Sequence, residues 1–242
     1  PKVLEARGKD YGSGQSEPEF LSLYADVGQS LSRFMETGNE VVLMTGEGML
    51  ALWAGLKSCR KPGDPVLCVS TGVFGEGMGE MAASIGCKVE MVSLPFNSTI
   101  GHAESLGRIE EAIRCTKPVM IPAVHCETPS GTLNPMEELG RLKKDHGVPL
   151  FLVDAVASLG GVPVRMDAWH VDLLLAGSQK CLSVPPSMSI LGVSESAWGR
   201  MKEVGYSGYD SILPFRDVQA AGRCPYTPYW HGLEALRASL DL

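Results

Sequence analysis

The stretch DLLLAGSQKCLSVPP, residues 172–186, decides how the rest of the chain is interpreted. Four apolar residues, 173–176, lead into Gly177, and Lys180 follows three positions later. A short, fully apolar run is typical of a strand that is buried on both faces in a mostly parallel sheet. Ligands of such sheets bind at the carboxyl ends of the strands. Lys180 therefore stands where a functional side chain is expected.

Similar apolar runs recur along the chain, and amphipathic helical patterns separate them. We predict strands over 41–44, 66–70, 88–94, 119–125, 150–154, 173–176 and 188–193, and helices near 48–58, 75–85, 104–114 and 135–145. This alternation predicts an α/β fold with a mostly parallel, seven-stranded sheet between helices. Residues 205–228 are rich in Gly, Pro and Tyr, and we predict a long loop there.

Composition bounds the class of protein. Of 242 residues, 44% are hydrophobic and 20% charged, as in an ordinary soluble globular protein. The net charge of −7 argues against non-specific nucleic-acid binding, and no apolar run approaches the roughly 20 residues of a membrane span. The seven cysteines include no CxxC pair. We therefore expect reduced thiols, no metal site and an intracellular protein, in the cytoplasm first, with peroxisome and mitochondrion left open.

Two Gly-rich turns follow the first two predicted strands. TGEGML (45–50) opens a helix, and its small residues and free N–H groups are typical of a phosphate cradle, although Glu47 would repel phosphate if its side chain pointed inward. STGVFGEG (70–77) places Phe74 among glycines as a candidate stacking plate for a planar ring. An ordinary strand–helix turn and core packing are the structural alternatives.

Three further strand ends carry polar groups. HCETPSGTLNP (125–135) offers the Thr128 hydroxyl, a histidine that we interpret as structural, and Glu127, which either orients its neighbours or binds nothing. FLVDAVASLGG (151–161) contains Asp154, which is costly to bury unless a partner such as a protonated ring nitrogen pairs with it, or else caps the next segment. Lys180, if partly desolvated, would have a lowered pKa and act as a nucleophile for Schiff-base chemistry.

Together these features describe one ligand: a planar ring with a phosphate arm, a protonated nitrogen and an aldehyde. Pyridoxal phosphate has this chemistry, and proteins hold it with a lysine and an aspartate. The sequence therefore predicts pyridoxal 5′-phosphate as the cofactor.

The chain also resembles the class V aminotransferases, which are fold-type I pyridoxal-phosphate enzymes, and within them the alanine–glyoxylate, serine–pyruvate and pyridoxamine–pyruvate branch. The matching stretches are VVLMTGEGMLAL, STGVFGEGMGEMA, VHCETPSGTLNP, FLVDAVASLGG, GSQKCLSVPPSMSILGVSESAW and PYTPYWHGLEAL. They cover nearly the whole chain in order. The GVFGEG, CETPSG and KCLSVPP stretches, with Glu47, favour the pyridoxamine–pyruvate type.

The resemblance implies roles for individual residues. Lys180 matches the internal-aldimine lysine and Asp154 the pyridinium partner, and these two are the expected catalytic residues. Phe74 and Val156 match the residues on the two faces of the ring. The other implied cofactor-binding residues are the backbone of Glu47, Gly48 and Met49, the Thr128 hydroxyl near O3′, Gln179 at the phosphate, and Tyr226 and Thr227, which would reach the phosphate of the neighbouring subunit of a homodimer.

The resemblance also implies a domain organisation. We expect an N-terminal segment over 1–30 and a pyridoxal-phosphate-binding large domain over 31–242. The family's smaller C-terminal domain, with the arginine that binds the substrate carboxylate, would lie beyond Leu242. Because the chain starts at Pro1 and ends within a helical pattern, we expect both ends to be cut.

The predicted function is that of a pyridoxal-phosphate-dependent aminotransferase. It would move an amino group from a small amino acid, or from pyridoxamine, to a 2-oxo acid such as pyruvate or glyoxylate, through a Schiff base at Lys180. Two alternatives stay open: a lyase of the same fold, similar to cysteine desulfurase or kynureninase, and a truncated, non-catalytic protein that binds the cofactor. No nucleic-acid or membrane partner is expected.

Overall fold

Strands between residues 40 and 193 form one sheet. The computed structural model describes residues 1–12 and 14–242, and in those residues seven strands pair in the order β1-β7-β6-β5-β4-β2-β3. The strands are β1 Glu40–Thr45, β2 Pro65–Ser70, β3 Lys88–Ser93, β4 Met120–Val124, β5 Leu150–Asp154, β6 Leu173–Gly177 and β7 Met188–Val193. From β3 to β6 the neighbours run parallel, and β7 lies antiparallel to both β6 and β1. The predicted mostly parallel, seven-stranded sheet is therefore confirmed.

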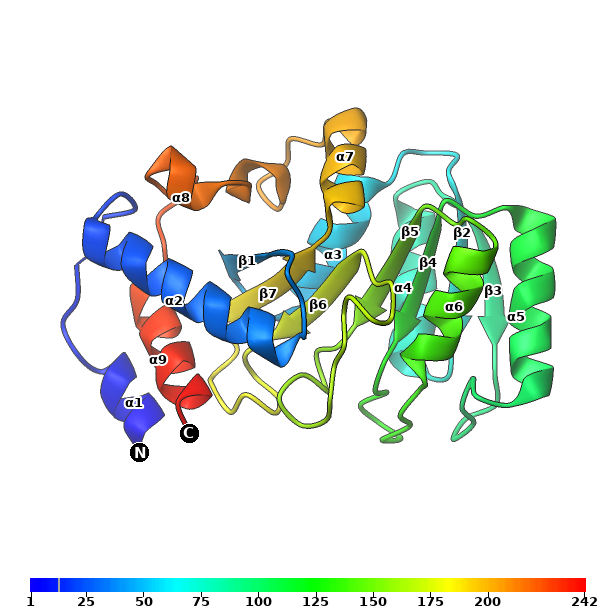
Figure 1. The fold of residues 1–242 in the computed structure, drawn as a ribbon, viewed down its shortest axis with the longest axis horizontal. Coiled ribbons are helices and arrows are strands. Elements are labelled where there is room, and N and C mark those ends of the chain that lie inside the picture. The colour runs from blue at the N-terminus through cyan, green and yellow to red at the C-terminus, as the bar shows by residue number, and fades with distance from the viewer. Residues whose placement is uncertain (13) are drawn as a thin grey trace.

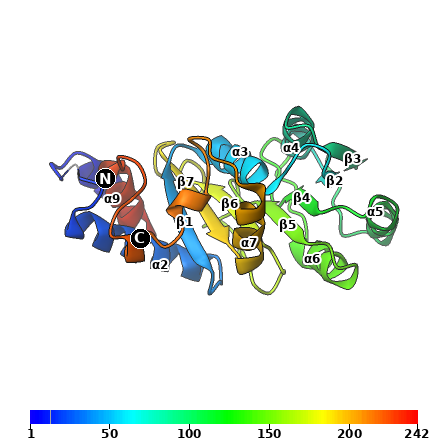
Figure 2. The same ribbon diagram turned by 90° about the horizontal axis from the view of Figure 1, so that it is seen from above.

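Helices cover both faces of this sheet (Figure 1). They are α1 Lys2–Arg7, α2 Pro18–Phe34, α3 Gly48–Cys59, α4 Val73–Ser84, α5 Ala103–Thr116, α6 Met136–Asp145, α7 Glu195–Val204, α8 Val218–Ala221 and α9 Trp230–Leu240, with a short 3-10 turn, η1, at Leu213–Phe215. Helices α3 and α4 lie on one face, and α2 and α6 lie on the other (Figure 2). The four helices predicted from the sequence correspond to α3, α4, α5 and α6.

Burial explains the apolar runs. Every residue of β4, β5, β6 and β7 is buried, because these strands lie inside the sheet with helices on both sides. Strand β3 is at the edge and is mostly exposed or half-buried, which matches its mixed sequence KVEMVS. The central strands therefore form a buried, apolar sheet, and the polar residues lie at the ends of these strands.

The N-terminal part differs from the sequence-based expectation. Helix α2 was not predicted, yet its buried residues, among them Phe20, Tyr24 and Val27, follow the helical spacing, and Pro18 occupies its first turn. The expected boundary at 30/31 falls within this helix, while the domain division itself stays a prediction. Likewise, residues 205–228 are not a plain loop, because they contain η1 and α8.

The seven cysteines are free thiols. Cys59, Cys68 and Cys224 are buried, and burial raises the pKa of each to about 12, so they behave as small hydrophobic residues. In the part of the chain that the structure describes, no helix has the length and apolarity needed to cross a bilayer.

Candidate functional site

A pocket lies at the carboxyl edge of the sheet, where the segments after β1, β2, β4, β5 and β6 converge. Its lining residues are Glu47, Gly48, Met49, Leu52, Phe74, Cys126, Thr128, Asp154, Val156, Ala157, Gln179 and Lys180. The structure thus brings together nine of the predicted site residues from five separate stretches of sequence. Tyr226 and Thr227 are the two that it leaves outside this pocket.

Asp154 ends β5 and is 4% exposed. Its Oδ1 accepts a hydrogen bond of 2.8 Å from the backbone N–H of Val156, and within the described residues its Oδ2 has no hydrogen-bond partner. Burial, with a smaller effect of the Glu127 charge, raises the pKa of Asp154 to about 7, although the Val156 N–H and Lys180 act in the opposite direction. The pocket thus holds a carboxyl group that a cationic ligand atom would stabilise in its charged form.

Lys180 follows β6 through two residues of decreasing burial: Ser178 is fully buried, Gln179 is half-buried and Lys180 is exposed. The expected partial desolvation of this lysine was therefore wrong for the chain as described, because the backbone has already left the sheet edge at that point. Lys180 still lines the pocket, and among the described residues its amine has no hydrogen-bond or ion-pair partner. A carbonyl group in the pocket would meet an amine that is accessible.

Two apolar side chains shape the middle of the pocket. Phe74 lies in the first turn of α4, and Val156 lies two residues beyond the end of β5. Val156 packs against the start of α3 so closely that a Cβ on Gly48 would lie 2.8 Å from Val156 Cγ2. Gly48 therefore has to be glycine for Val156 to keep its place in the pocket.

The start of α3 is already capped from within the chain. Glu47 Oε2 accepts hydrogen bonds of 3.0 Å from the backbone N–H of Met49 and of 3.0 Å from Nε2 of Gln179. The Oε1 atom of Gln179 is buried without a hydrogen-bond partner. Two of the donors that would hold an anion here are thus engaged by Glu47, and Gln179 Oε1 adds an unpaired acceptor.

Behind the pocket, His125 is buried and structural, as predicted. Its Nδ1 lies 2.9 Å from Ser158 Oγ, its ring meets Trp169 edge to face, and its backbone N–H donates to the carbonyl of Asp154. Burial lowers the pKa of His125 to about 4, so the ring is neutral at pH 7.

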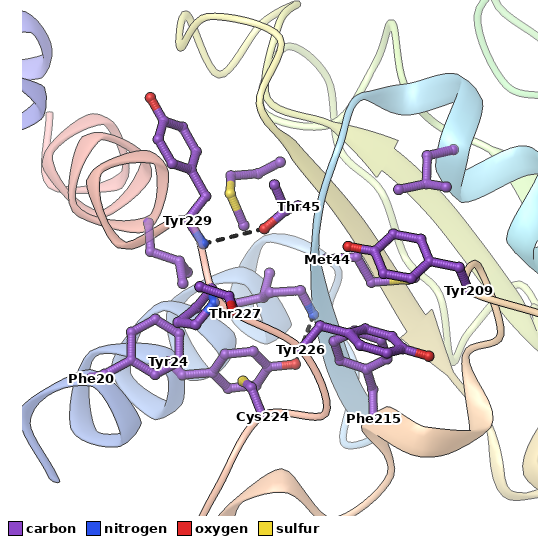
Figure 3. Close-up of a pocket in the computed structure, with 15 residues that line it drawn as sticks. Phe20, Tyr24, Met44, Thr45, Tyr209, Phe215, Cys224, Tyr226, Thr227 and Tyr229 are labelled. Atoms are coloured by element: carbon purple, nitrogen blue, oxygen red, sulfur yellow. Dashed lines mark hydrogen bonds between the residues drawn. The ribbon is translucent and has the colours of Figure 1, made fainter. Parts of the chain in front are cut away.

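Tyr226 and Thr227 line a second, largely apolar pocket. Its other walls include Tyr24, Met44, Phe215 and Tyr209. The Tyr226 ring lies 4.5 Å from Tyr209 and 6.0 Å from Phe215, while Thr227 is exposed (Figure 3). The expectation that these two residues serve the site of a neighbouring subunit stays a prediction.

Sequence reasoning missed three lining residues, namely Leu52, Cys126 and Ala157. Cys126 and Ala157 sit beside predicted site residues, so their position after β4 and β5 was an available signal. Leu52 is one helical turn beyond Gly48 on α3, and the helical period could have found it. The described residues contain no cluster of His, Cys, Asp and Glu suited to a metal ion.

Comparisons with known proteins agree with this geometry. The family model described as aminotransferase class-V matches residues 15–218. The pyridoxamine–pyruvate transaminase of Mesorhizobium japonicum is 32% identical to the chain, and the match covers 100% of this chain and 61% of that protein. The alanine–glyoxylate aminotransferase of Oryctolagus cuniculus is also 32% identical, with 100% and 62% covered. The crystal structure of pyridoxamine–pyruvate aminotransferase from Mesorhizobium loti superposes with a TM-score of 0.90 at 30% identity, covering 100% of this chain and 61% of that one.

The chain thus spans less than two thirds of the length of these relatives. The family match nevertheless includes every residue of the pocket. This chain belongs to the class-V aminotransferase family.

Proposed function

We propose that the chain works as a pyridoxal-phosphate-dependent aminotransferase, passing an amino group from a small amino acid, or from pyridoxamine, to a 2-oxo acid such as pyruvate or glyoxylate. The observation that carries this proposal is the convergence of Lys180, Asp154, Phe74 and Val156 in one pocket. An amine, a buried carboxyl group and apolar walls are the groups that a pyridoxal ring requires.

The ring end of the ligand fits these residues. Asp154 has an oxygen without a partner among the described residues and a pKa raised to about 7, so a protonated ring nitrogen would satisfy both its hydrogen-bonding capacity and its charge. Phe74 and Val156 offer apolar contact to the ring, and the Thr128 side chain is exposed beside it. When bound, the pyridoxal group supplies an aldehyde that exchanges amino groups and a ring that withdraws electrons.

The chain's own residues then have definite tasks. The Nζ atom of Lys180 would hold the ring through its aldehyde, and as a free amine it would take the proton from the substrate Cα as a general base and deliver it as a general acid. Asp154 would keep the ring nitrogen protonated. The apolar walls exclude water from the reacting carbon.

The first experiment is borohydride reduction of the ligand-loaded chain, followed by peptide mapping. We expect an absorbance band at roughly 400–430 nm, and a pyridoxyl group on Lys180 after reduction. Lys180→Ala should lose both, with Lys144→Ala, an exposed lysine on α6, as the control. A band that persists in Lys180→Ala would contradict the assigned role.

A second candidate concerns the other end of the ring. Because Glu47 engages the Met49 N–H and Gln179 Nε2, and Gln179 Oε1 is an unpaired acceptor, this end offers acceptors to the ligand. A phosphate group carries negative charge and would face the Glu47 carboxylate, whereas a hydroxymethyl group can donate a hydrogen bond. These contacts favour unphosphorylated pyridoxamine as amino donor, which is the substrate in the name of the Mesorhizobium relatives.

Binding of pyridoxal and of pyridoxal phosphate to the same chain tests this candidate. We expect wild type to prefer pyridoxal, and Glu47→Ser to tighten pyridoxal phosphate by about 10- to 100-fold, corresponding to the removal of 1.4–2.8 kcal/mol of repulsion. Glu76→Ser removes a carboxylate from the first turn of the neighbouring helix α4 and should leave the preference unchanged. Tighter binding of pyridoxal phosphate than of pyridoxal by wild type would instead support pyridoxal phosphate as the resident cofactor.

Product analysis separates transamination from the open alternatives. Conversion of the bound ring to its amine form by an amino acid, with release of a 2-oxo acid, supports the aminotransferase. Sulfide or alanine release from cysteine would support a lyase. Ring binding without any conversion would support a non-catalytic binding protein.

The free thiols are consistent with an intracellular, reducing setting.

A homodimer with shared sites is the remaining part of the proposal. The exposed Thr227 side chain and the half-buried Tyr226 next to it support a role at a neighbouring subunit. Lys180→Ala and Tyr226→Ala chains should each be inactive alone and regain about a quarter of wild-type activity when mixed, because one site of each mixed dimer keeps both residues. Absence of any recovery from dimers shown to exchange subunits would contradict shared sites.

A further inference from the structure

Glu127 is a fully buried carboxylate, 0% exposed, that does not line the pocket. It lies in the segment after β4, three residues beyond that strand. A carboxylate is expensive to bury unless it is hydrogen-bonded, so its partners indicate its purpose.

The partners of Glu127 are the first N–H groups of α4. Its Oε2 accepts from the backbone N–H of Phe74 at 3.2 Å, and its Oε1 accepts from that of Gly75 at 2.8 Å. The first turn of a helix leaves its N–H groups unpaired and carries partial positive charge. The N-cap residue of α4 is Gly72, which has no side chain to accept these bonds. Glu127 therefore caps α4 from 52 residues away.

The local sequence is adapted to this contact. A Cβ on Gly72 would lie 2.9 Å from Glu127 Cδ, so only glycine lets the carboxylate approach the helix end. A second bond joins the same two segments, since Asn134 Nδ2 donates to Thr71 Oγ1 at 2.8 Å. The segments after β2 and β4 are thereby fixed to each other directly beside the pocket.

Of the residues that Glu127 holds, Phe74 is the one that lines the pocket. Both hydrogen bonds fix the backbone from which the Phe74 ring projects. The Glu127 charge also acts on Asp154, whose pKa it helps burial to raise. Glu127 thus influences both the apolar wall and the acidic partner of the proposed ring, without facing the pocket itself.

We propose that Glu127 is a positioning residue of this site: by capping α4 it fixes the plane of Phe74 against the bound pyridoxal ring. The inference rests on the proposed function for the identity of the ring. The predicted consequence is that loss of the cap loosens the ring's orientation while leaving the Lys180 amine in place.

The test uses pyridoxal and pyridoxal phosphate as probes, with circular dichroism of the bound chromophore as the readout. In Glu127→Gln one oxygen still accepts a bond, while the amide group opposes the second N–H. We expect the induced dichroism to fall at least twofold and Kd to rise about tenfold, a loss comparable to one aromatic contact of 1.4 kcal/mol. Borohydride should still attach the probe to Lys180. Glu76→Gln, on the exposed side of the same first turn, should change none of these readouts.

Gly72→Ala gives an independent second variant, because its Cβ would displace the Glu127 carboxylate without removing it. It should reproduce the loss of induced dichroism. If Glu127→Gln does not fold, Gly72→Ala still tests whether the Glu127 cap orients Phe74. Wild-type dichroism and Kd in a folded Glu127→Gln, or in Gly72→Ala, would overturn the inference. Failure of wild type to bind either probe would instead contradict the proposed function.

Discussion

At the residue scale, Asp154 shows a conflict between stability and binding. Its carboxyl group is buried, and its pKa is raised from 3.8 to about 7. The unfolded chain therefore releases this proton at lower pH than the folded chain does. Stability from this group is fully present below about pH 4 and is lost as pH rises toward 7. Asparagine has the shape of aspartate without its charge, so asparagine at position 154 would remove this loss of stability at higher pH.

We therefore predict that Asp154→Asn stabilises the ligand-free chain at pH 8 by about 2–4 kcal/mol and has little effect near pH 4. The same change should weaken pyridoxal binding about 10- to 100-fold, because the ring nitrogen loses a charged partner. Urea denaturation at the two pH values and a binding titration measure these effects. Asp145→Asn, at an exposed site at the end of α6, is the control. A destabilised Asp154→Asn chain at pH 8 would mean that the carboxylate already has a stabilising partner.

At the element scale, the start of α3 is packed without spare room. A Cβ on Gly48 would lie 2.8 Å and 2.9 Å from the two methyl groups of Val156. Gly48→Ala should destabilise the chain by about 1–3 kcal/mol through overpacking and weaken pyridoxal binding about tenfold, because Val156 is pushed from its place in the pocket.

Gly77 provides the matched control, since it lies in helix α4 and a Cβ there meets nothing within 4 Å. Gly77→Ala should stabilise the chain by about 0.5–1 kcal/mol and leave binding unchanged. Thermal unfolding and pyridoxal titration of both variants make the comparison. Equal effects of the two changes would show that helix propensity, rather than contact with Val156, governs the result.

The same scale shows why the sheet was predictable. Strands β5 and β7 have the bounds predicted for them, because a strand covered on both faces is almost entirely apolar and stands out from its neighbours in the sequence. Helix α2 has an equally clear pattern, but most of it falls in residues 1–30, which were assigned to an N-terminal segment. The cap of α4 and the bond from Gln179 that supports the cap of α3 could not be predicted, because Glu127 acts across 52 residues and Gln179 reaches Glu47 across 132. Only the folded sheet brings those strand ends together.

At the scale of the whole molecule, the chain's two ends meet beyond β1, where α1 and α9 pack side by side near α2 (Figure 1). Helix α9 also touches the site's surroundings, because Ser239 Oγ donates to the carbonyl of Leu182, two residues after Lys180. The sequence showed a helical pattern over the last residues but not their partner. The second pocket, built from α2, β1, the 209–229 segment and α9, likewise depends on tertiary packing alone.

The pH dependence of the free energy of unfolding depends on two buried, neighbouring titratable residues, His125 and Asp154. The pKa of His125 is lowered from 6.5 to about 4, because the folded chain favours the neutral ring. The contribution of His125 to the free energy of unfolding is therefore lost as pH falls from about 6.5 to 4. The pKa of Asp154 is raised from 3.8 to about 7. The contribution of Asp154 to the free energy of unfolding therefore grows as pH falls over nearly the same interval. The two effects oppose each other, each on the order of 3–4 kcal/mol from the size of the shifts.

We predict that their sum leaves the wild-type free energy of unfolding nearly flat between pH 4.5 and 6.5, to within about 1 kcal/mol for this pair. Asp154→Asn should then lose stability on acidification, because only the His125 effect remains. His125→Gln should gain stability on acidification for the opposite reason. Urea denaturation across this range gives the slopes, and the double variant should again be flat. Parallel slopes in the two single variants would show that groups other than this buried pair set the acid response of the fold.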